Sequence, residues 1–177
     1  NYVPSDYTQF YNRAEQAVFA DYVVVMAYDE HYNGSEEGSV ASIGFVTEGV
    51  ENTLLEVPAE QIILGMPFYT RVWELVPKGD DVPEVEAASE DYVPYTVNSS
   101  AVGMEEAENR AAVNGATPVW SEEDGQYYVE YENGGNTYKI WLEDENSMEL
   151  RLQLMREKGL AGASFWKLGL EKSSIWD

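Results

Sequence analysis

The amino-acid sequence predicts an α/β fold built around a parallel sheet. Three segments with helical spacing of apolar residues are each followed, after a short link, by a short apolar segment of strand length. Helices that alternate with strands in this way are typical of parallel βα units. A chain of 177 residues is long enough for one domain, or for one domain with an inserted lobe.

The first unit begins near the amino end of the chain. Ser5 or Asp6 can cap a helix, and apolar residues keep helical spacing to about Ala20. The strand that follows, residues 21–28, is apolar at 22–27, which predicts burial on both faces.

Polar residues follow this strand at once. Ligands of α/β sheets and barrels meet the carboxyl ends of the strands, so Tyr28, Asp29 and Glu30 are candidate site residues. The alternative is a polar exit that only begins a loop.

The second and third units repeat the pattern. A helix over 42–55 precedes a strand over 61–69, and a helix over 144–158, ended by Gly159, precedes a strand over 160–166. Both strands end in aromatic or charged side chains, namely Tyr69, Arg71, Trp73 and Trp166.

Residues 74–140 lack this alternation and predict a small inserted α+β lobe. An acidic, proline-containing segment, 78–95, indicates an exposed loop, and 105–113 indicates a short helix. Segments 126–132 and 137–142 alternate around an Asn-Gly-Gly-Asn turn, which predicts a β-hairpin.

Composition excludes several classes of function. With 33 acidic against 10 basic residues the formal net charge is −23, which would repel nucleic acid and anionic lipid. There is no cysteine, and His31 is the single histidine, so a zinc site or a cysteine nucleophile is not expected. We expect no cofactor and no membrane insertion.

The three strand ends are predicted to converge on one face. Aromatic rings beside hydroxyls, amides and carboxylates suit a carbohydrate, which offers flat C–H patches and a rim of hydroxyls. The alternative is that the aromatics are packing residues and that Asp29 and Arg71 form only an ion pair.

Four motifs resemble family 18 of the glycoside hydrolases, the chitinase-like (β/α)8 barrels. Met26-Ala27-Tyr28-Asp29 is similar to the family's sixth strand, and Gly65-Met66-Pro67-Phe68-Tyr69-Thr70-Arg71 to its seventh, with Thr70 in place of the usual glycine. Trp141-Leu142-Glu143-Asp144 with Ser147 resembles the segment that begins the last helix, and Gly162 to Gly169 resembles the eighth strand. The motifs occur in the family's order. They most resemble the motifs of its bacterial spore-wall and cell-envelope branch.

The resemblance implies a partial TIM barrel, residues 1–73 and 141–177, interrupted by the lobe at 74–140. It also implies substrate-assisted hydrolysis of β-1,4 bonds next to N-acetylglucosamine, in chitin or peptidoglycan, outside the cell or in its envelope. In this mechanism the substrate's acetamido oxygen replaces the carboxylate nucleophile.

The resemblance also implies a role for each site residue. Tyr28 would hold the acetamido oxygen, and Asp29 would contact the distorted sugar. Met26 would pack beneath the acetamido group, Trp166 would form the floor, and Tyr69 and Arg71 would line the cleft. Trp73, with the lobe, would form one wall.

One departure matters most. The family's general acid ends an Asp-x-x-Asp-x-Asp-x-Glu run on the fourth strand, and no segment of this chain matches that run. Because the leaving oxygen must be protonated, we expect the chain alone to be inactive and a longer parent to be the hydrolase. A half-barrel would also expose strand edges, which predicts a homodimer.

Two alternatives remain open. The parent could be a non-hydrolytic chitin- or peptidoglycan-binding lectin, or the chain could be an autonomous module whose acidic surface binds a basic partner.

Overall fold

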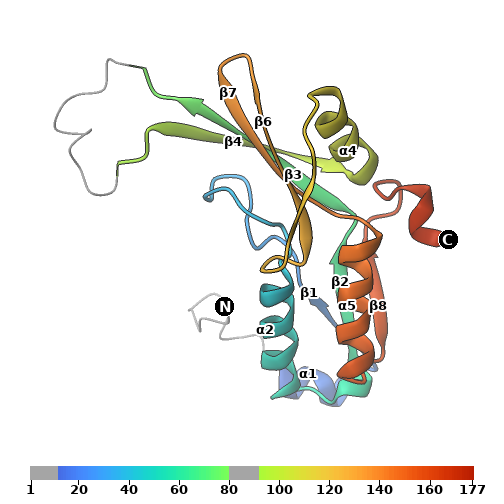
Figure 1. The fold of residues 1–177 in the computed structure, drawn as a ribbon. Helices are drawn as coiled ribbons and strands as arrows, with labels where there is room; N and C mark the ends of the chain where they lie inside the picture. The colour runs from blue at the N-terminus through green and yellow to red at the C-terminus, as the bar shows by residue number, and fades with distance from the viewer. Residues whose placement is uncertain (1–11, 80–91) are drawn as a thin grey trace.

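A computed structural model describes residues 12–79 and 92–177 (Figure 1). The predicted start of the first helix at Ser5 or Asp6 and most of the acidic loop lie outside these residues. The first described helix, α1, spans Arg13–Phe19, and the side chain of Asn12 accepts a hydrogen bond from the Glu15 N–H at 3.0 Å. The second helix, α2, spans Ile43–Leu54 and begins at the N-cap Ser42.

Three parallel strands form the first sheet. They are β1 (Val23–Met26), β2 (Ile62–Pro67) and β8 (Gly162–Trp166), in the order β1-β2-β8. A short 3₁₀ helix, η1 (Ala59–Gln61), leads into β2. The α/β class predicted from the alternation is therefore confirmed.

Helices α2 and α5 (Glu145–Glu157) cover one face of this sheet (Figure 1). Their apolar faces pack on alternate residues of β2, and Ile62, Leu64 and Met66 are each fully buried there. This packing forms the main core of the chain, because the helices remove the apolar face of β2 from water.

Strand β1 differs from the prediction that it is buried on both faces. Val24 is 52% exposed and Met26 is 69% exposed, while Val23 and Val25 are half-buried. Among the described residues, β1 is an edge strand that pairs only with β2, and the helices cover a single face of the sheet. Val24 and Met26 therefore point to the side that no described element covers.

An antiparallel sheet of five strands forms the second layer of structure. In the order β4-β3-β7-β6-β5 it contains β3 (Tyr69–Pro77), β4 (Tyr95–Gly103), β5 (Val119–Ser121), β6 (Gln126–Asn133) and β7 (Asn136–Leu142). The predicted hairpin is β6–β7, paired from Tyr127↔Leu142 to Asn133↔Asn136, and is confirmed. Helix α4 (Met104–Val113) packs on this sheet through Ala107 and Ala111.

Strands β3 and β4 were not predicted. β2 ends at Pro67 and β3 begins at Tyr69, so a single residue, Phe68, connects the two sheets. β3 then pairs with β4 over nine residues, from Tyr69↔Gly103 to Pro77↔Tyr95.

The ends of α5 agree with the sequence signals. Asp144 caps the helix, accepting from the Ser147 N–H at 2.9 Å, while the Ser147 hydroxyl accepts from the Asp144 N–H at 3.0 Å. After the C-cap Lys158, Gly159 adopts φ +66°, the left-handed conformation that ends helices. The chain closes with a 3₁₀ helix, η2 (Ser173–Trp176). Within 12–79 and 92–177, no helix has the length and apolar character needed to cross a membrane.

Candidate functional site

The site is built at the carboxyl end of β1. After the strand, Asp29 adopts φ +62° and is the one non-glycine residue among those described with a positive φ. Aspartate tolerates this left-handed conformation better than most residues, yet it still costs free energy. The surrounding contacts must therefore hold the Asp29 backbone in place.

One of these contacts joins the segment after β1 to β3. The Tyr69 hydroxyl donates a hydrogen bond to Asp29 Oδ1 at 2.5 Å. The ring of Tyr28 meets that of Tyr69 edge to face, with 6.2 Å between centroids and 78° between planes. Tyr28, Asp29 and Tyr69, which the sequence placed on different strand ends, thus form one cluster.

Burial shapes the chemistry of this cluster. Desolvation, followed by the hydrogen bond and charge of Asp29, raises the pKa of Tyr69 well above 10.0. Desolvation and the same carboxylate raise the pKa of Tyr28. Both phenols therefore keep their protons at neutral pH and can act as hydrogen-bond donors.

A cavity of about 270 Å³ opens beside this cluster. It is lined by Asp29, Tyr69, Arg71, Ala101, Val102, Trp166 and Leu170. Trp166 is 57% exposed, so its indole offers an open aromatic surface next to the carboxylate of Asp29. An aromatic face beside polar groups is the arrangement that carbohydrate recognition requires.

Arg71 brings positive charge to the cavity. Its Nη1 donates to the Ser99 hydroxyl at 3.1 Å, and that hydroxyl lies 3.5 Å from Asn33 Oδ1. Among the described residues, Arg71 Nε is buried and has no hydrogen-bond partner. An unused buried donor is uncommon in native structures and is consistent with a functional role for this side chain.

Three predicted site residues do not line this cavity. Tyr28 contacts the ring of Tyr69 beside it, and the other two are Met26 and Trp73. Met26 is 69% exposed on the open face of the parallel sheet and does not line the cavity. Trp73, predicted to line the cleft, is fully buried, and its indole N–H donates to the Gly38 carbonyl at 2.8 Å. Because no part of the Trp73 ring reaches the surface, it supports the loop after β1 instead of presenting a wall to a ligand.

The structure also adds residues that sequence reasoning missed. Ser99, Ala101 and Val102 reach the site from β4, and Leu170 reaches it from the segment after β8. They were missed because β4 was not predicted; only the alternation of Tyr95, Val97 and Ser99 could have indicated it. His31 lies in the loop after β1, with Nδ1 2.8 Å from the Ser39 carbonyl oxygen.

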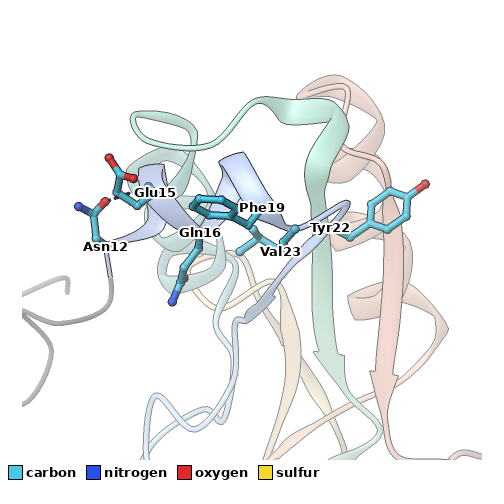
Figure 2. Close-up of a pocket in the computed structure, with 7 residues that line it drawn as sticks. Asn12, Glu15, Gln16, Phe19, Tyr22 and Val23 are labelled. Carbon is cyan, nitrogen blue, oxygen red and sulfur yellow. Dashed lines mark hydrogen bonds between the residues drawn. The ribbon is translucent and has the colours of Figure 1, made fainter.

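A larger hollow of about 600 Å³ lies at the other end of β1 (Figure 2). It is formed between α1 and the start of β1, with Phe19, Tyr22 and Val23 among its lining residues. Glu15 is the one charged side chain that lines it, so the hollow lacks the pairing of a carboxylate with an arginine seen beside Asp29. Across 12–79 and 92–177, no group of three or more His, Cys, Asp or Glu is placed to hold a metal ion.

Comparison with known families decides the classification. The model of the glycosyl hydrolases family 18 matches residues 2–171. The chain belongs to family 18. The resemblance carried by the four strand and helix motifs is thereby confirmed.

Two of the curated relatives come from Bacillus subtilis (strain 168). The chain is 34% identical over 151 residues to YdhD of Bacillus subtilis (strain 168), named a sporulation-specific glycosylase, covering 85% of this chain and 32% of that protein. It is 29% identical over 160 residues to the cortical fragment-lytic enzyme of the same organism, covering 88% and 33%. The chain thus spans about a third of the length of these relatives.

Solved family 18 structures share the fold. A plant class V chitinase mutant from Cycas revoluta in complex with (GlcNAc)3 aligns with a TM-score of 0.69 at 26% identity, covering 90% of this chain and 45% of that one. The arrangement of the two sheets is therefore that of family 18 enzymes.

Proposed function

We propose that this chain supplies part of the active site of a hydrolase that cleaves β-1,4 bonds next to N-acetylglucosamine. The observation that carries the proposal is the Tyr28–Asp29–Tyr69 cluster beside the exposed indole of Trp166. Family membership and relatives named as glycosylase, cortical fragment-lytic enzyme and chitinase support this class of substrate.

The proposed reaction is substrate-assisted and retaining. The acetamido oxygen of the sugar attacks the anomeric carbon, the glycosidic C–O bond breaks, and the leaving oxygen takes a proton. Water then opens the cyclic oxazolinium intermediate and restores the original configuration. Tyr28, which keeps its proton, donates a hydrogen bond to the attacking oxygen. Asp29, oriented by Tyr69, contacts the distorted sugar through its other oxygen.

The cavity side chains would bind the same sugar. Trp166 would stack beneath its apolar face, and Arg71 would donate to its hydroxyl or carbonyl oxygens. The acidic surface, with a net charge of −23, favours a neutral polysaccharide over an anionic one.

We propose further that the parallel sheet is the last three strands of an eight-stranded barrel. Strands β1, β2 and β8 would be the sixth, seventh and eighth strands, and the region 74–140 would be the inserted lobe. The general acid would then lie outside this chain. The relatives indicate a location at the cell envelope or in the spore wall.

Hydrolysis of a chromogenic chitooligosaccharide tests the proposal. We expect activity from a full-length protein that contains this chain and none from the 177 residues alone. Asp29→Asn in the full-length protein should lower kcat at least about a hundredfold, since it removes charge from the reacting site. Asp21→Asn, at an exposed position before β1, is the matched control and should leave kcat unchanged.

A second candidate rests on the missing general-acid motif. If the parent also lacks that glutamate, the site would be a chitin- or peptidoglycan-binding lectin. Calorimetric binding of chitotriose without hydrolysis in the full-length protein would favour the lectin, and hydrolysis would exclude it.

A further inference from the structure

We propose that a buried ring of hydrogen bonds fixes the loop after Asp29, and that Gln126 acts as a positioning residue for that carboxylate. The β1–α2 loop, residues 27–42, carries Tyr28 and Asp29 at one end and the N-cap of α2 at the other. The inference rests on the proposed function, because it assigns a role in the same site. It concerns residues of the lobe and of α5, none of which lines the cavity.

The ring passes through three separate parts of the chain. The Ser39 hydroxyl donates to Gln126 Oε1 on β6, and Gln126 Nε2 donates to Glu143 Oε1 at 2.9 Å. Arg151 on α5 donates to both oxygens of Glu143, at 2.5 and 3.0 Å, and also to the Ala41 carbonyl. The chain of hydrogen bonds begins at Ser39 and ends at Ala41, so it holds the loop at two points.

Burial makes this ring rigid. Ser39 is 3% exposed, Gln126 0%, Glu143 1% and Arg151 1%. In such surroundings hydrogen bonds are strong, and a polar group that loses its partner is costly. Among the described residues of the ring, Arg151 Nε is the one buried side-chain donor without a hydrogen-bond partner. The Glu143 carboxylate accepts two hydrogen bonds from the Arg151 guanidinium. A paired contact of this kind fixes the orientation of both side chains. The ring therefore favours one arrangement of the loop.

The gripped residues connect directly to Asp29. The Glu30 N–H donates to the Val40 carbonyl at 2.9 Å, and the Glu30 carboxylate accepts from the Ser42 N–H at 2.8 Å. Val40 and Ser42 flank Ala41, so Glu30 is bonded on both sides of the point where Arg151 holds the loop. Because Glu30 follows Asp29, these bonds help hold Asp29 in its left-handed conformation.

The antiparallel sheet adds two contacts on the outer part of the loop. Besides the Trp73 bond from β3 to Gly38, Lys139 on β7 lies 2.9 Å from Glu37 Oε1. This sheet thus holds the loop that carries Asp29 as well as forming one side of the cavity. A displacement of about 1 Å at a reacting group can cost about a hundredfold in rate, so this support bears on the chemistry.

Hydrogen exchange of the 177-residue chain tests the structural part of this inference. Gln126→Met keeps the length of the side chain and removes its three hydrogen bonds, to the Ser39 hydroxyl, the Glu143 carboxylate and the Leu142 carbonyl. We expect exchange of the amides of Glu30 and Ala41 to accelerate at least about tenfold, with the β3–β4 ladder unchanged. Gln153→Met makes the same change at an exposed site on α5 and should leave the loop as in the wild type. Unchanged loop exchange in Gln126→Met would overturn the inference.

Kinetics of the full-length hydrolase test the functional part. Positioning predicts that Gln126→Met lowers kcat by about ten- to a hundredfold with a small change in KM, whereas a purely structural role would lower the melting temperature and leave kcat per folded molecule unchanged. Ser39→Ala removes only one hydrogen bond of the ring, the one to Gln126. It replaces Gln126→Met in both experiments if that variant does not fold. A wild-type protein without hydrolysis would contradict the proposed function, and the exchange result would still decide whether the ring holds the loop.

Discussion

At the scale of single residues, the Tyr69–Asp29 hydrogen bond connects stability to pH. Because its folded-state pKa is raised, Tyr69 contributes stability that is present below pH 10 and is lost as the pH rises above that value. The cause is first the burial of the phenol and then the carboxylate of Asp29. The same contact that orients the carboxylate thus makes the fold sensitive to alkali.

Tyr69→Phe should remove that sensitivity. At neutral pH we expect a loss of about 1 kcal/mol in the free energy of unfolding, since the hydrogen bond to Asp29 is gone. Between about pH 9 and pH 11 the variant should lose less stability than the wild type. Urea unfolding at several pH values measures both effects. Tyr22→Phe, at a 59% exposed position, is the control, and a variant slope equal to that of the wild type would contradict the prediction.

At the scale of elements, the close approach of β1 and β2 depends on one glycine. A Cβ atom at Gly65 would lie 2.8 Å from the Val25 carbonyl oxygen and 3.5 Å from the ring of Tyr28. The parallel register places Gly65 opposite Met26, directly before the site. The absence of a side chain at Gly65 therefore determines both how closely β1 and β2 pack and where the Tyr28 ring lies.

Gly65→Ala should accordingly push the two strands apart. We expect a loss of about 1–3 kcal/mol in unfolding free energy, the usual cost of overpacking against a backbone that cannot yield. Gly49→Ala on α2 has open space around its Cβ and should be neutral or stabilising by up to about 1 kcal/mol. Thermal melts of both variants provide the measurement; equal melting temperatures would show that β1 can shift freely.

Elements also show what the sequence could predict. The helices α2 and α5, the parallel strands and the β6–β7 hairpin follow from local periodicity and turn residues. Strand β4 was missed because it is rich in Ser, Thr and Asn and forms through its pairing with β3. The burial of Trp73 depends on a partner 35 residues away, a separation that no local pattern reveals.

At the scale of the whole molecule, the open face and edges of the parallel sheet predict self-association. Within residues 12–79 and 92–177, β1 and β8 each pair on one side only, and Val24 and Met26 of β1 are exposed. Unpaired edges of this kind are templates for pairing with another chain. The net charge of −23 makes two copies of the chain repel each other. Because salt screens this repulsion, added salt should promote self-association.

We therefore expect the 177-residue chain to form dimers in sedimentation experiments, more strongly at high salt. Val24→Lys should shift the population toward monomer, since a lysine on an edge strand discourages pairing. Val113→Lys, at an 81% exposed position on α4, adds the same charge away from the sheet and should have little effect. A monomer at every concentration and salt level would contradict the prediction.

The pairing of β3 with β7 also has an evolutionary consequence. The chain leaves the parallel sheet through β3 and comes back through β7, and these strands are hydrogen-bonded neighbours from Val72↔Ile140 to Leu75↔Thr137. The segment between β3 and β7 begins and ends on adjacent strands, so its length can change at little entropic cost. Natural selection can therefore lengthen or shorten its outer parts. Its base is under tighter constraint, because Trp73, Gln126 and Lys139 hold the loop beside Asp29. Among homologues, the length and sequence of this segment should vary most at the ends of the strands far from the parallel sheet. They should vary least near Trp73, Gln126 and Lys139.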